Sequence, residues 1–251
     1  MYGFIITFSI AVSIFFASKL AKKKNLDSDI LYGGMFWVIL SGIIGARLYH
    51  VVHFWSFYSE NPALIINLRI GGMAIYGAII FGVAAGLIYL KIKKQHITDW
   101  IDLGGLLLPL SQAIGRWGNY FNRELFGAPT SLPWGIYIPP EKRPEIFKDY
   151  EKFHPLFLYE SLLNLMLFLF LLWVFNKKTG TFENADGLKK GSVFFLYLAG
   201  YGLIRFFMEF LKLDAWKIAG LNTAQIISIL LVLSGIFGIR KLNSNDKTAD
   251  N

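Results

Sequence analysis

Long apolar segments alternate with short polar ones from one end of this chain to the other. Most of the apolar segments approach 20 residues, the length of helix that spans the hydrocarbon core of a bilayer. The fourth segment is shorter, so we expect it to be tilted or broken. The pattern predicts an all-α polytopic membrane protein with about seven transmembrane helices. The predicted segments lie at about 2–20, 31–54, 71–91, 101–114, 155–175, 192–211 and 222–239.

The composition agrees with a membrane protein and excludes an ordinary soluble domain. Hydrophobic residues make up 55% of the 251 residues and charged residues 17%, against roughly 25% charged in a typical globular protein. A soluble fold would have to hide several helix-length apolar runs at once. The chain contains no cysteine, which excludes a cysteine nucleophile, a disulfide framework and a thiolate metal site.

The basic residues predict how the helices are oriented in the membrane. Fourteen of the 25 Lys and Arg residues lie in four stretches, at 19–24, 91–94, 177–190 and 240–247. These stretches fall at every second loop, as the positive-inside rule requires of a cytoplasmic face. We therefore expect the N-terminus outside and the C-terminus in the cytoplasm. The same clustering explains the net charge of +8, and nucleic acid is not an expected partner.

Two further segments are assigned from their charges and prolines. The first apolar segment is a membrane anchor and not a cleavable signal peptide, because its lysines follow it. The stretch at 115–154 holds six of the eight prolines, counting Pro155 at its edge, and a run of charges. It is predicted to form a small extracytoplasmic cap. We expect one transmembrane domain over 1–240 that includes this cap, and a polar, disordered cytoplasmic tail at 241–251.

Ionisable side chains inside the apolar segments need a partner or a function, because each costs roughly 2.5–3.5 kcal/mol to insert. With the predicted orientation, these groups all fall toward the extracytoplasmic leaflet. Unrelated structural polar residues would be more scattered in depth. We therefore predict one polar cavity that opens outward. The residues concerned are Tyr2, Arg47, Tyr76, Arg116, Asn119, Tyr159, Glu160, Tyr201, Arg205, Glu209 and Gln225.

One stripe of polar residues lies on the sixth segment. Tyr201, Arg205 and Glu209 are spaced i, i+4, i+8, so they share one face of a helix. An Arg205–Glu209 pair that merely neutralises itself is one interpretation. The other is an arginine that faces a phosphate and is oriented by a carboxylate, since the guanidinium fork offers paired donors to phosphate.

The densest polar cluster is the sequence GRWGNYFNRELFG at 115–127. It places Arg116, Asn119, Asn122, Arg123 and Glu124 in a stretch of nine residues that follows an apolar run. Its three glycines permit tight backbone, and irregular backbone at membrane depth is tolerated where it lines a cavity. The alternative is an interfacial loop whose arginines extend to the membrane surface.

Other candidates give weaker signals. The sequence GGMAIYGA at 71–78 is rich in small residues, which are routine at helix contacts in membranes. Tyr76 within it fits an interfacial aromatic belt just as well. The four histidines show no zinc-ligand spacing, and no metal is expected. His154 lies at the outer end of the fifth segment and is a possible base.

Five motifs together resemble one protein family. GARLYHV, GGMAIYGA, GRWGNYFNRELFG, HPLFLYE and YGLIRFFMEFLKLD occur in this order. They are similar to those of the bacterial phosphatidylglycerol–prolipoprotein diacylglyceryl transferases. The resemblance extends from Tyr2 to about Gly238, and the segment that usually precedes the family's Tyr-Gly pair is missing, through loss or a misassigned start. It also implies the predicted topology, with the site at the outer leaflet of the cytoplasmic (inner) membrane.

The resemblance implies a reaction, partners and site residues. A member moves the diacylglyceryl group of phosphatidylglycerol onto the lipobox cysteine thiol of a prolipoprotein, forms a thioether and releases glycerol-1-phosphate. The partners are this lipid, the prolipoprotein signal peptide and the bilayer, and no cofactor is expected. The expected catalytic residues are Arg116, Arg205, Asn119, Tyr76 and Glu209. The expected substrate-binding residues are Arg116, Tyr201, Gly127, Glu124, Tyr2 and Asn122.

Two positions depart from the family pattern. Many members have His, a proposed base, where this chain has Tyr76, and often Arg where it has Lys212. In physical terms, Arg116 and Arg205 would bind the phosphodiester and stabilise the charge on the leaving oxygen. The base stays open between Tyr76, His154 and a carboxylate. A transporter or lipid-binding protein with the same basic cavity is the alternative function, and an intramembrane protease lacks a credible site.

Overall fold

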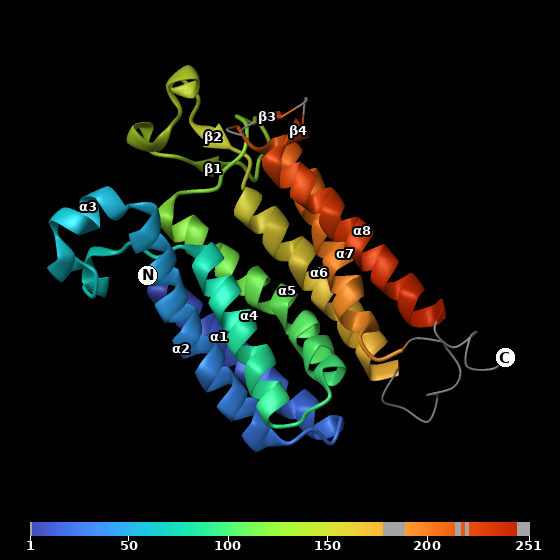
Figure 1. Cartoon of the computed structure of the whole chain (residues 1–251). Helices are drawn as coiled ribbons and strands as arrows, with labels where there is room; N and C mark the ends of the chain where they lie inside the picture. The colour runs from blue at the N-terminus through green and yellow to red at the C-terminus, as the bar shows by residue number, and fades with distance from the viewer. Residues whose placement is uncertain (1, 178–188, 214–216, 219–220, 245–251) are drawn as a thin grey trace. The chain divides into compact units, whose positions relative to one another are not determined.

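The computed structural model describes residues 2–177, 189–213, 217–218 and 221–244, and these residues are mostly helical (Figure 1). The predicted all-α polytopic fold is confirmed. The cytoplasmic tail predicted as disordered is helical up to Ser244, and the remainder lies outside the described residues. The main helices are α1 (Tyr2–Lys23), α2 (Ser28–His53), α3 (Trp55–Glu60), α4 (Ile75–Ile92), α5 (Ile97–Asn122), α6 (Leu156–Lys177), α7 (Ser192–Met208) and α8 (Thr223–Ser244).

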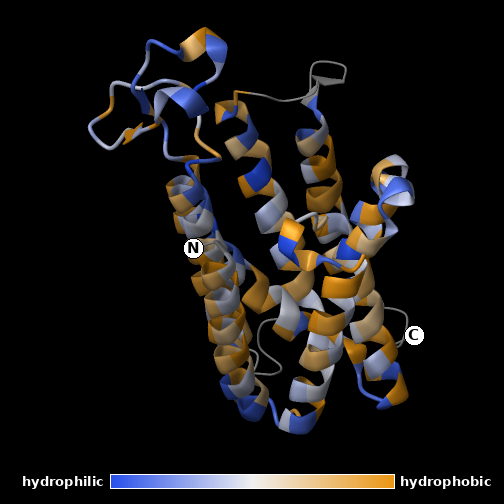
Figure 2. Cartoon of the chain, turned by 90° about the vertical axis from the view of Figure 1, so that its left-hand side faces the viewer, coloured by the Kyte–Doolittle hydropathy of each residue, from blue (hydrophilic) through white to orange (hydrophobic). Residues whose placement is uncertain are grey.

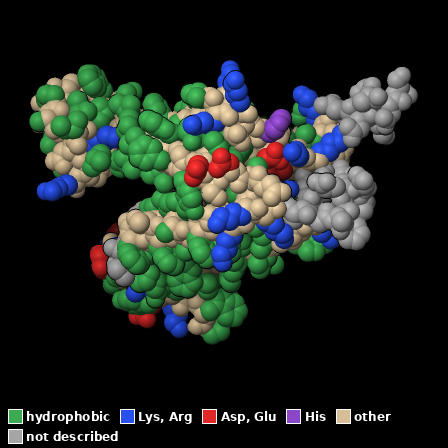
Figure 3. Space-filling view, turned by 90° about the horizontal axis from the view of Figure 1, so that it is seen from below, with side chains coloured by type: hydrophobic (Ala, Val, Ile, Leu, Met, Phe, Trp, Pro, Cys, Tyr) green, Lys and Arg blue, Asp and Glu red, His purple; other side chains and the backbone are tan. Residues whose placement is uncertain are grey.

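Six helices, not seven, are long and apolar enough to cross a membrane among the described residues. They are α1, α2, α4, α6, α7 and α8. Hydrophobic residues predominate along these helices and hydrophilic residues gather near their ends (Figure 2). Large hydrophobic side chains are exposed along these helices, among them Phe8, Ile80 and Leu230, and hydrophobic side chains also make up much of the face seen in Figure 3. This distribution suits helices surrounded by lipid.

Helix α5 differs most from its prediction. The segment at 101–114 was expected to be short and tilted or broken, but α5 is one helix of 26 residues that includes Pro109. Polar residues such as Asp102 and Asn119 interrupt its apolar pattern, and both are buried. A helix enclosed by other helices does not need a lipid-facing apolar surface. The apolar segment is therefore shorter than the helix that contains it.

The chain forms two compact units, which are described separately. The first comprises residues 1–20 and 98–251, and the second comprises residues 21–97. In the first unit, Ser9 and Ser13 of α1 contact Ser111 of α5, with Ser9 Oγ donating to the Ser111 carbonyl at 3.0 Å. Helices α7 and α8 pack closely, since a Cβ at Gly202 would lie 2.7 Å from the Ser228 carbonyl oxygen.

A buried carboxylate joins α5 to the start of α7. Asp102 Oδ2 accepts the backbone N–H of Gly191 at 2.7 Å, and Oδ1 accepts that of Phe194 at 3.0 Å. The first N–H groups of a helix have no partner within the helix, and a negative charge there is favourable. Asp102 thereby fixes α7 against α5, the two helices that bear the predicted site arginines.

Residues 123–155, which make up most of the stretch predicted as a cap, connect α5 to α6 and are called the cap below. Two short strands pair antiparallel, β1 (Ile136–Tyr137) and β2 (Lys152–Phe153), with Ile136 opposite Phe153. The side chains of Ile138 and Phe153 are fully buried and give the cap a small core. Its other elements are the 3-10 turns η3 (Pro140–Lys142) and η4 (Glu145–Phe147). Two more short strands, β3 (Lys217–Ile218) and β4 (Leu221–Asn222), pair just before α8.

The second unit is built on α2 and α4, which pack antiparallel. Their backbones touch at glycines, because a Cβ at Gly77 would collide with the Gly45 carbonyl oxygen. This is the close helix approach that small residues permit in membranes. The connection between the two helices contains α3 and the 3-10 turns η1 (Pro62–Leu64) and η2 (Leu68–Ile70).

Candidate functional site

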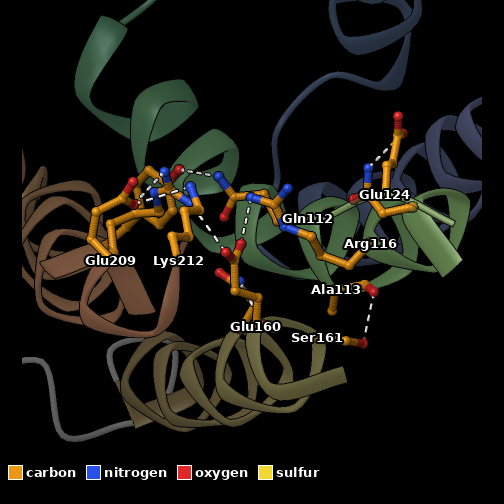
Figure 4. Close-up of polar contacts among 12 residues, drawn as sticks. Gln112, Ala113, Arg116, Glu124, Glu160, Ser161, Glu209 and Lys212 are labelled. Carbon is orange, nitrogen blue, oxygen red and sulfur yellow. Dashed lines mark hydrogen bonds and ion pairs between the residues drawn. The ribbon is translucent and has the colours of Figure 1, made fainter. Parts of the chain in front are cut away.

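Two arginines from different helices meet on one carboxylate in the first unit. Arg116 Nη2 of α5 lies 2.5 Å from Glu160 Oε2 of α6, and Arg205 Nη1 of α7 donates to Glu160 Oε1 at 3.0 Å. The Glu160 side chain is 2% exposed, whereas those of Arg116 and Arg205 are 20% and 17% exposed. Figure 4 shows the Arg116 and Glu160 side chains directed toward each other from their helices. The carboxylate is therefore buried, and the two arginine side chains are partly exposed.

The ion pairs continue from Arg205 into the 3-10 turn η5 (Glu209–Leu211), which directly follows α7. Arg205 Nη2 lies 3.0 Å from Glu209 Oε2, and Lys212 Nζ lies 3.1 Å from the same oxygen. The Arg205–Glu209 pair considered from the sequence is present, but Arg205 also binds Glu160, so the pair does not simply neutralise itself. We call these five side chains the ion-pair chain: Arg116, Glu160, Arg205, Glu209 and Lys212. It has three cationic and two anionic members, a formal net charge of +1.

A net positive charge at a partly buried cluster favours the approach of an anion. Arginine offers paired donors to phosphate or carboxylate oxygens, and such charge-assisted hydrogen bonds are stronger than neutral ones. One monoanion would bring the ion-pair chain to neutrality, which avoids leaving an uncompensated charge in a poorly solvated place. The geometry therefore suits a phosphodiester, which has a single negative charge.

A second cluster lies one helical turn beyond Arg116, at the end of α5. Glu124 turns back toward the helix and its Oε1 accepts from Asn119 Nδ2 at 2.9 Å and from Asn122 Nδ2 at 3.3 Å. The turn is made by Arg123 and Leu125, both with positive φ. Asn119 is buried, so Glu124 fixes the orientation of its carboxamide beside the site.

Comparison with known proteins now adds to this geometry. Residues 1–240 match the model of a family described as "Prolipoprotein diacylglyceryl transferase". The chain is 40% identical over 238 residues to the phosphatidylglycerol–prolipoprotein diacylglyceryl transferase of Trichormus variabilis, covering 95% of this chain and 83% of that protein. It is 36% identical over 241 residues to that of Thermosynechococcus vestitus, covering 96% and 87%.

This chain belongs to the prolipoprotein diacylglyceryl transferase family. A relative from Prochlorococcus marinus, with the same name, is 40% identical over 260 residues. The family resemblance inferred from the five motifs is thus confirmed. The roles of individual residues in the transferase remain predictions, and the structure shows what surrounds each of them.

The predicted irregular backbone at 115–127 is wrong for most of its length. Residues 115–122 belong to α5, and the non-helical part begins after Asn122. Continuing the helix keeps Gln112, Arg116 and Asn119 on one face, at i, i+4 and i+7. Arg123 lies just beyond the end of α5, with its guanidinium over the Tyr120 ring at 5.0 Å and its Nη1 donating to the Tyr137 carbonyl at 3.4 Å. Arg123 therefore contacts the segment after α5, whereas Arg116 contacts the buried Glu160.

The opposite face of α5 is apolar. Leu110, Ile114 and Trp117 line an open groove of about 420 Å³ between α1, α5 and α6. Because these residues follow one another at i, i+4 and i+7, they lie on a different side of the helix from Arg116. The groove therefore belongs to the surface between helices and not to the ion-pair chain.

Other predicted residues lie around the site with definite contacts. Tyr201 stacks on Tyr197 with ring centroids 5.7 Å apart, and Gln112 donates to the Tyr197 hydroxyl at 2.9 Å. A Cβ at Gly127 would lie 2.8 Å from the Leu211 carbonyl oxygen, so glycine is required there for packing. Its role in binding substrate stays a prediction. Tyr2 is the first residue of α1, and its side chain is outside the described part.

The candidate bases His154 and Tyr76 have different surroundings. Trp134 Nε1 donates to the Tyr159 hydroxyl at 2.8 Å, and this hydroxyl lies 3.1 Å from His154 Nδ1. These contacts fasten the cap to the start of α6. Tyr76 is in the second unit at the start of α4, where its side chain is 61% exposed and its ring lies 6.2 Å from that of Tyr49. The choice between these bases stays open.

Sequence reasoning gave no role to Glu160, which lies between the two arginines, and grouped Arg47 with the site residues. Glu160 was noted as ionisable but received no role, although a carboxylate in an apolar segment is a signal by itself. Arg47 was expected in the polar cavity. In the structure it binds backbone carbonyls of its own unit, with Arg47 Nε donating to Ile65 at 2.8 Å. A pattern of residue types does not distinguish an arginine that binds substrate from one that supports a loop.

Proposed function

We propose that this chain transfers the diacylglyceryl group of phosphatidylglycerol to prolipoproteins, as the names of its relatives state for those proteins. The observation that supports the proposal most directly is the convergence of Arg116 and Arg205 on Glu160, within an ion-pair chain of net charge +1. Phosphatidylglycerol is a phosphodiester with one negative charge. It is the anion that this site would neutralise.

The reaction is a displacement at the glycerol carbon that bears the phosphate. The sulfur of the lipobox cysteine forms a bond to this carbon, the carbon–oxygen bond to phosphate breaks, and glycerol-1-phosphate leaves. The thiol gives up its proton and the phosphate gains negative charge. Arg116 and Arg205 would hold the phosphodiester before the reaction and stabilise the leaving oxygens during it, usually the largest contribution in a site of this kind.

The carboxylates then act by positioning the arginines. Glu160 binds both guanidiniums, so they present their remaining N–H groups toward one place instead of separating. Glu209 binds Arg205 from the other side. Fixed donors cost no reorganisation when charge develops, which is the advantage of a preformed site. Asn119, held by Glu124, would add a hydrogen bond to the substrate.

Transfer by the purified chain tests the proposal. The protein, reconstituted in vesicles containing phosphatidylglycerol, is incubated with a lipobox peptide, and the thioether product is detected by mass spectrometry. We expect the peptide to gain one diacylglyceryl group, with release of glycerol-1-phosphate. A lipobox peptide with serine in place of cysteine, and vesicles without phosphatidylglycerol, are the controls. Lipid binding without any modified peptide would contradict transferase activity.

We further propose that the site faces the outer leaflet of a bacterial cytoplasmic membrane. The chain has no cysteine, so single introduced cysteines report the side of the membrane directly. Lys148→Cys, at an exposed cap position, should react with an impermeant maleimide added to intact cells. Lys93→Cys, at the C-terminal end of α4, should react only after the cells are opened. The reverse labelling pattern would overturn the orientation.

Tyr76 is expected to donate a hydrogen bond and not to accept the thiol proton. A tyrosine hydroxyl is a poor base at neutral pH, but it can donate to a phosphate oxygen as a neutral histidine does. Tyr76→Phe should therefore lower single-turnover transfer by about 10²–10³-fold at most, by analogy with loss of one anion-binding donor. Tyr76→His should keep substantial activity. Full activity in Tyr76→Phe would assign Tyr76 to the aromatic belt instead.

A further inference from the structure

The second unit contains a loop, residues 61–74, that is organised around Arg47. The Arg47 side chain extends from α2 and is buried. All five of its N–H groups donate to backbone carbonyl oxygens of this loop, at distances between 2.5 and 3.0 Å. The accepting residues are Leu64, Ile65, Asn67, Gly71 and Gly72. The Arg47 guanidinium, which is always charged, thus donates to backbone carbonyls and not to a carboxylate.

Two glycines allow the loop to turn its carbonyls toward Arg47. Gly71 and Gly72 have φ values of 79° and 80°, a conformation that other residues rarely adopt. At Gly72 a Cβ would also lie 2.6 Å from the His50 ring and 2.8 Å from Arg47 Nη1. The loop then ends where the N–H of Ala74 donates to the Ala46 carbonyl at 3.0 Å, two residues before Tyr76.

The outer surface of the same loop is apolar. Ile66 is 86% exposed, and Leu68, Ile70 and Met73 are also exposed. Within residues 61–74 the sequence contains one charged residue, Arg69. The cap is different, because charged residues dominate its sequence between Glu141 and Lys152. The 61–74 loop therefore has an apolar surface, whereas the cap is rich in charged residues.

These two features have a common physical explanation. A loop exposed to water can hydrate its carbonyls and does not need a buried arginine to satisfy them. In lipid no water is available, each unsatisfied backbone group costs free energy, and irregular backbone needs partners within the protein. We propose that the 61–74 loop is immersed in the lipid interface, with Ile66 and Leu68 against the acyl chains, and that Arg47 replaces water as the partner of its carbonyls.

The position of the loop agrees with immersion. Together with α3 it connects α2 and α4, which are both candidate membrane spans, and its C-terminal end at Ala74 directly precedes α4. Tryptophan is enriched at this depth, and Trp55 in the preceding helix α3 is exposed. The side chain of Arg69 is long enough to extend toward lipid headgroups. The loop thus forms a lipid-contacting surface directly before Tyr76.

Collision rates of a nitroxide label measure immersion independently of catalysis. Ile66→Cys is labelled in the otherwise cysteine-free chain and reconstituted in phosphatidylglycerol-containing vesicles. Oxygen concentrates in lipid, whereas a water-soluble nickel chelate stays outside. Labels at Leu230→Cys, exposed on α8, and Lys148→Cys, exposed in the cap, give the lipid and water references. We expect position 66 to favour oxygen, as position 230 does.

The proposal fails in two recognisable ways. If the label at position 66 meets the nickel chelate as often as the label at position 148, the loop lies in water. If it meets neither reagent, protein covers the loop instead of lipid. Both readings come from the otherwise unchanged chain, so they do not depend on whether an Arg47 variant folds. They are also unaffected by a failure of the proposed transferase activity.

Arg47→Lys then tests the role of the arginine. The lysine ammonium has three donors on one nitrogen, so it cannot serve five carbonyls that surround a planar guanidinium. The unsatisfied carbonyls should draw the loop toward water, and the label at position 66 should meet the nickel chelate more often. Arg69→Lys, at the exposed loop arginine, is the matched control and should leave the collision rates unchanged. Unchanged rates in Arg47→Lys would show that Arg47 does not maintain immersion.

Discussion

Glu160→Gln should lower diacylglyceryl transfer by about 10²–10³-fold and also destabilise the protein. The neutral amide has nearly the same shape, but it no longer compensates the charges of Arg116 and Arg205, which both lie within 3.0 Å of the carboxylate. The guanidiniums should separate toward water, and preformed anion donors that lose alignment cost rates of this order. Removing one partner of a buried ion pair costs roughly 3–5 kcal/mol, and less where the remaining side chains are partly exposed, as those of Arg116 and Arg205 are.

A double-mutant cycle that combines Glu160→Gln with Arg116→Gln distinguishes the loss of this ion pair from a general loss of stability. Thermal unfolding in detergent and transfer to a lipobox peptide are measured for the two single variants and the double variant. If Glu160 acts by holding Arg116, the two effects on activity should not be additive, as is usual for residues in direct contact. Glu145→Gln is the matched control, because Glu145 forms an exposed ion pair with Lys148 in the cap. Strictly additive effects on activity would contradict a positioning role for Glu160.

Arg205→Lys should reduce transfer by about 10²–10³-fold while the fold is kept. Lysine preserves the positive charge but not the planar fork, which binds two oxygens at once. Arg205 uses this fork to contact Glu160 through Nη1 and Glu209 through Nη2. A single ammonium cannot hold both carboxylates and a phosphate together. The loss of one well-placed donor to a developing anion sets the expected size of the effect.

The comparison with Arg123→Lys shows whether the effect is specific to the ion-pair chain. Arg123 is also near the site in sequence, but it contacts the Tyr137 carbonyl at 3.4 Å and the Tyr120 ring, and not a carboxylate of the ion-pair chain. We expect Arg123→Lys to retain most activity. Transfer is measured at several phosphatidylglycerol concentrations, with the unfolding temperature of each variant as the stability control. Equal losses in the two variants would mean that general positive charge, and not a shaped site, supports the reaction.

The sequence by itself determined the features that depend on local chemistry. Helix-length apolar runs have one stable state in lipid, a helix that satisfies its own backbone, so the all-helical fold followed from the pattern. The stripe of Tyr201, Arg205 and Glu209 followed from the helical period, and the Arg205–Glu209 pair is present. The five motifs were sufficient to indicate the family that the comparisons confirmed.

The tertiary structure decided which of these local features work together. Hydropathy misjudged α5, because a helix enclosed by protein needs no continuous apolar surface. Arg47 and Arg116 looked equivalent in the sequence, yet one binds five carbonyls of a loop and the other a carboxylate. Glu160 joins α5 to α7 from a third helix. Helical periodicity fixes the face on which a residue lies, but the partner facing it comes from a distant part of the chain, and only helix packing brings the two together.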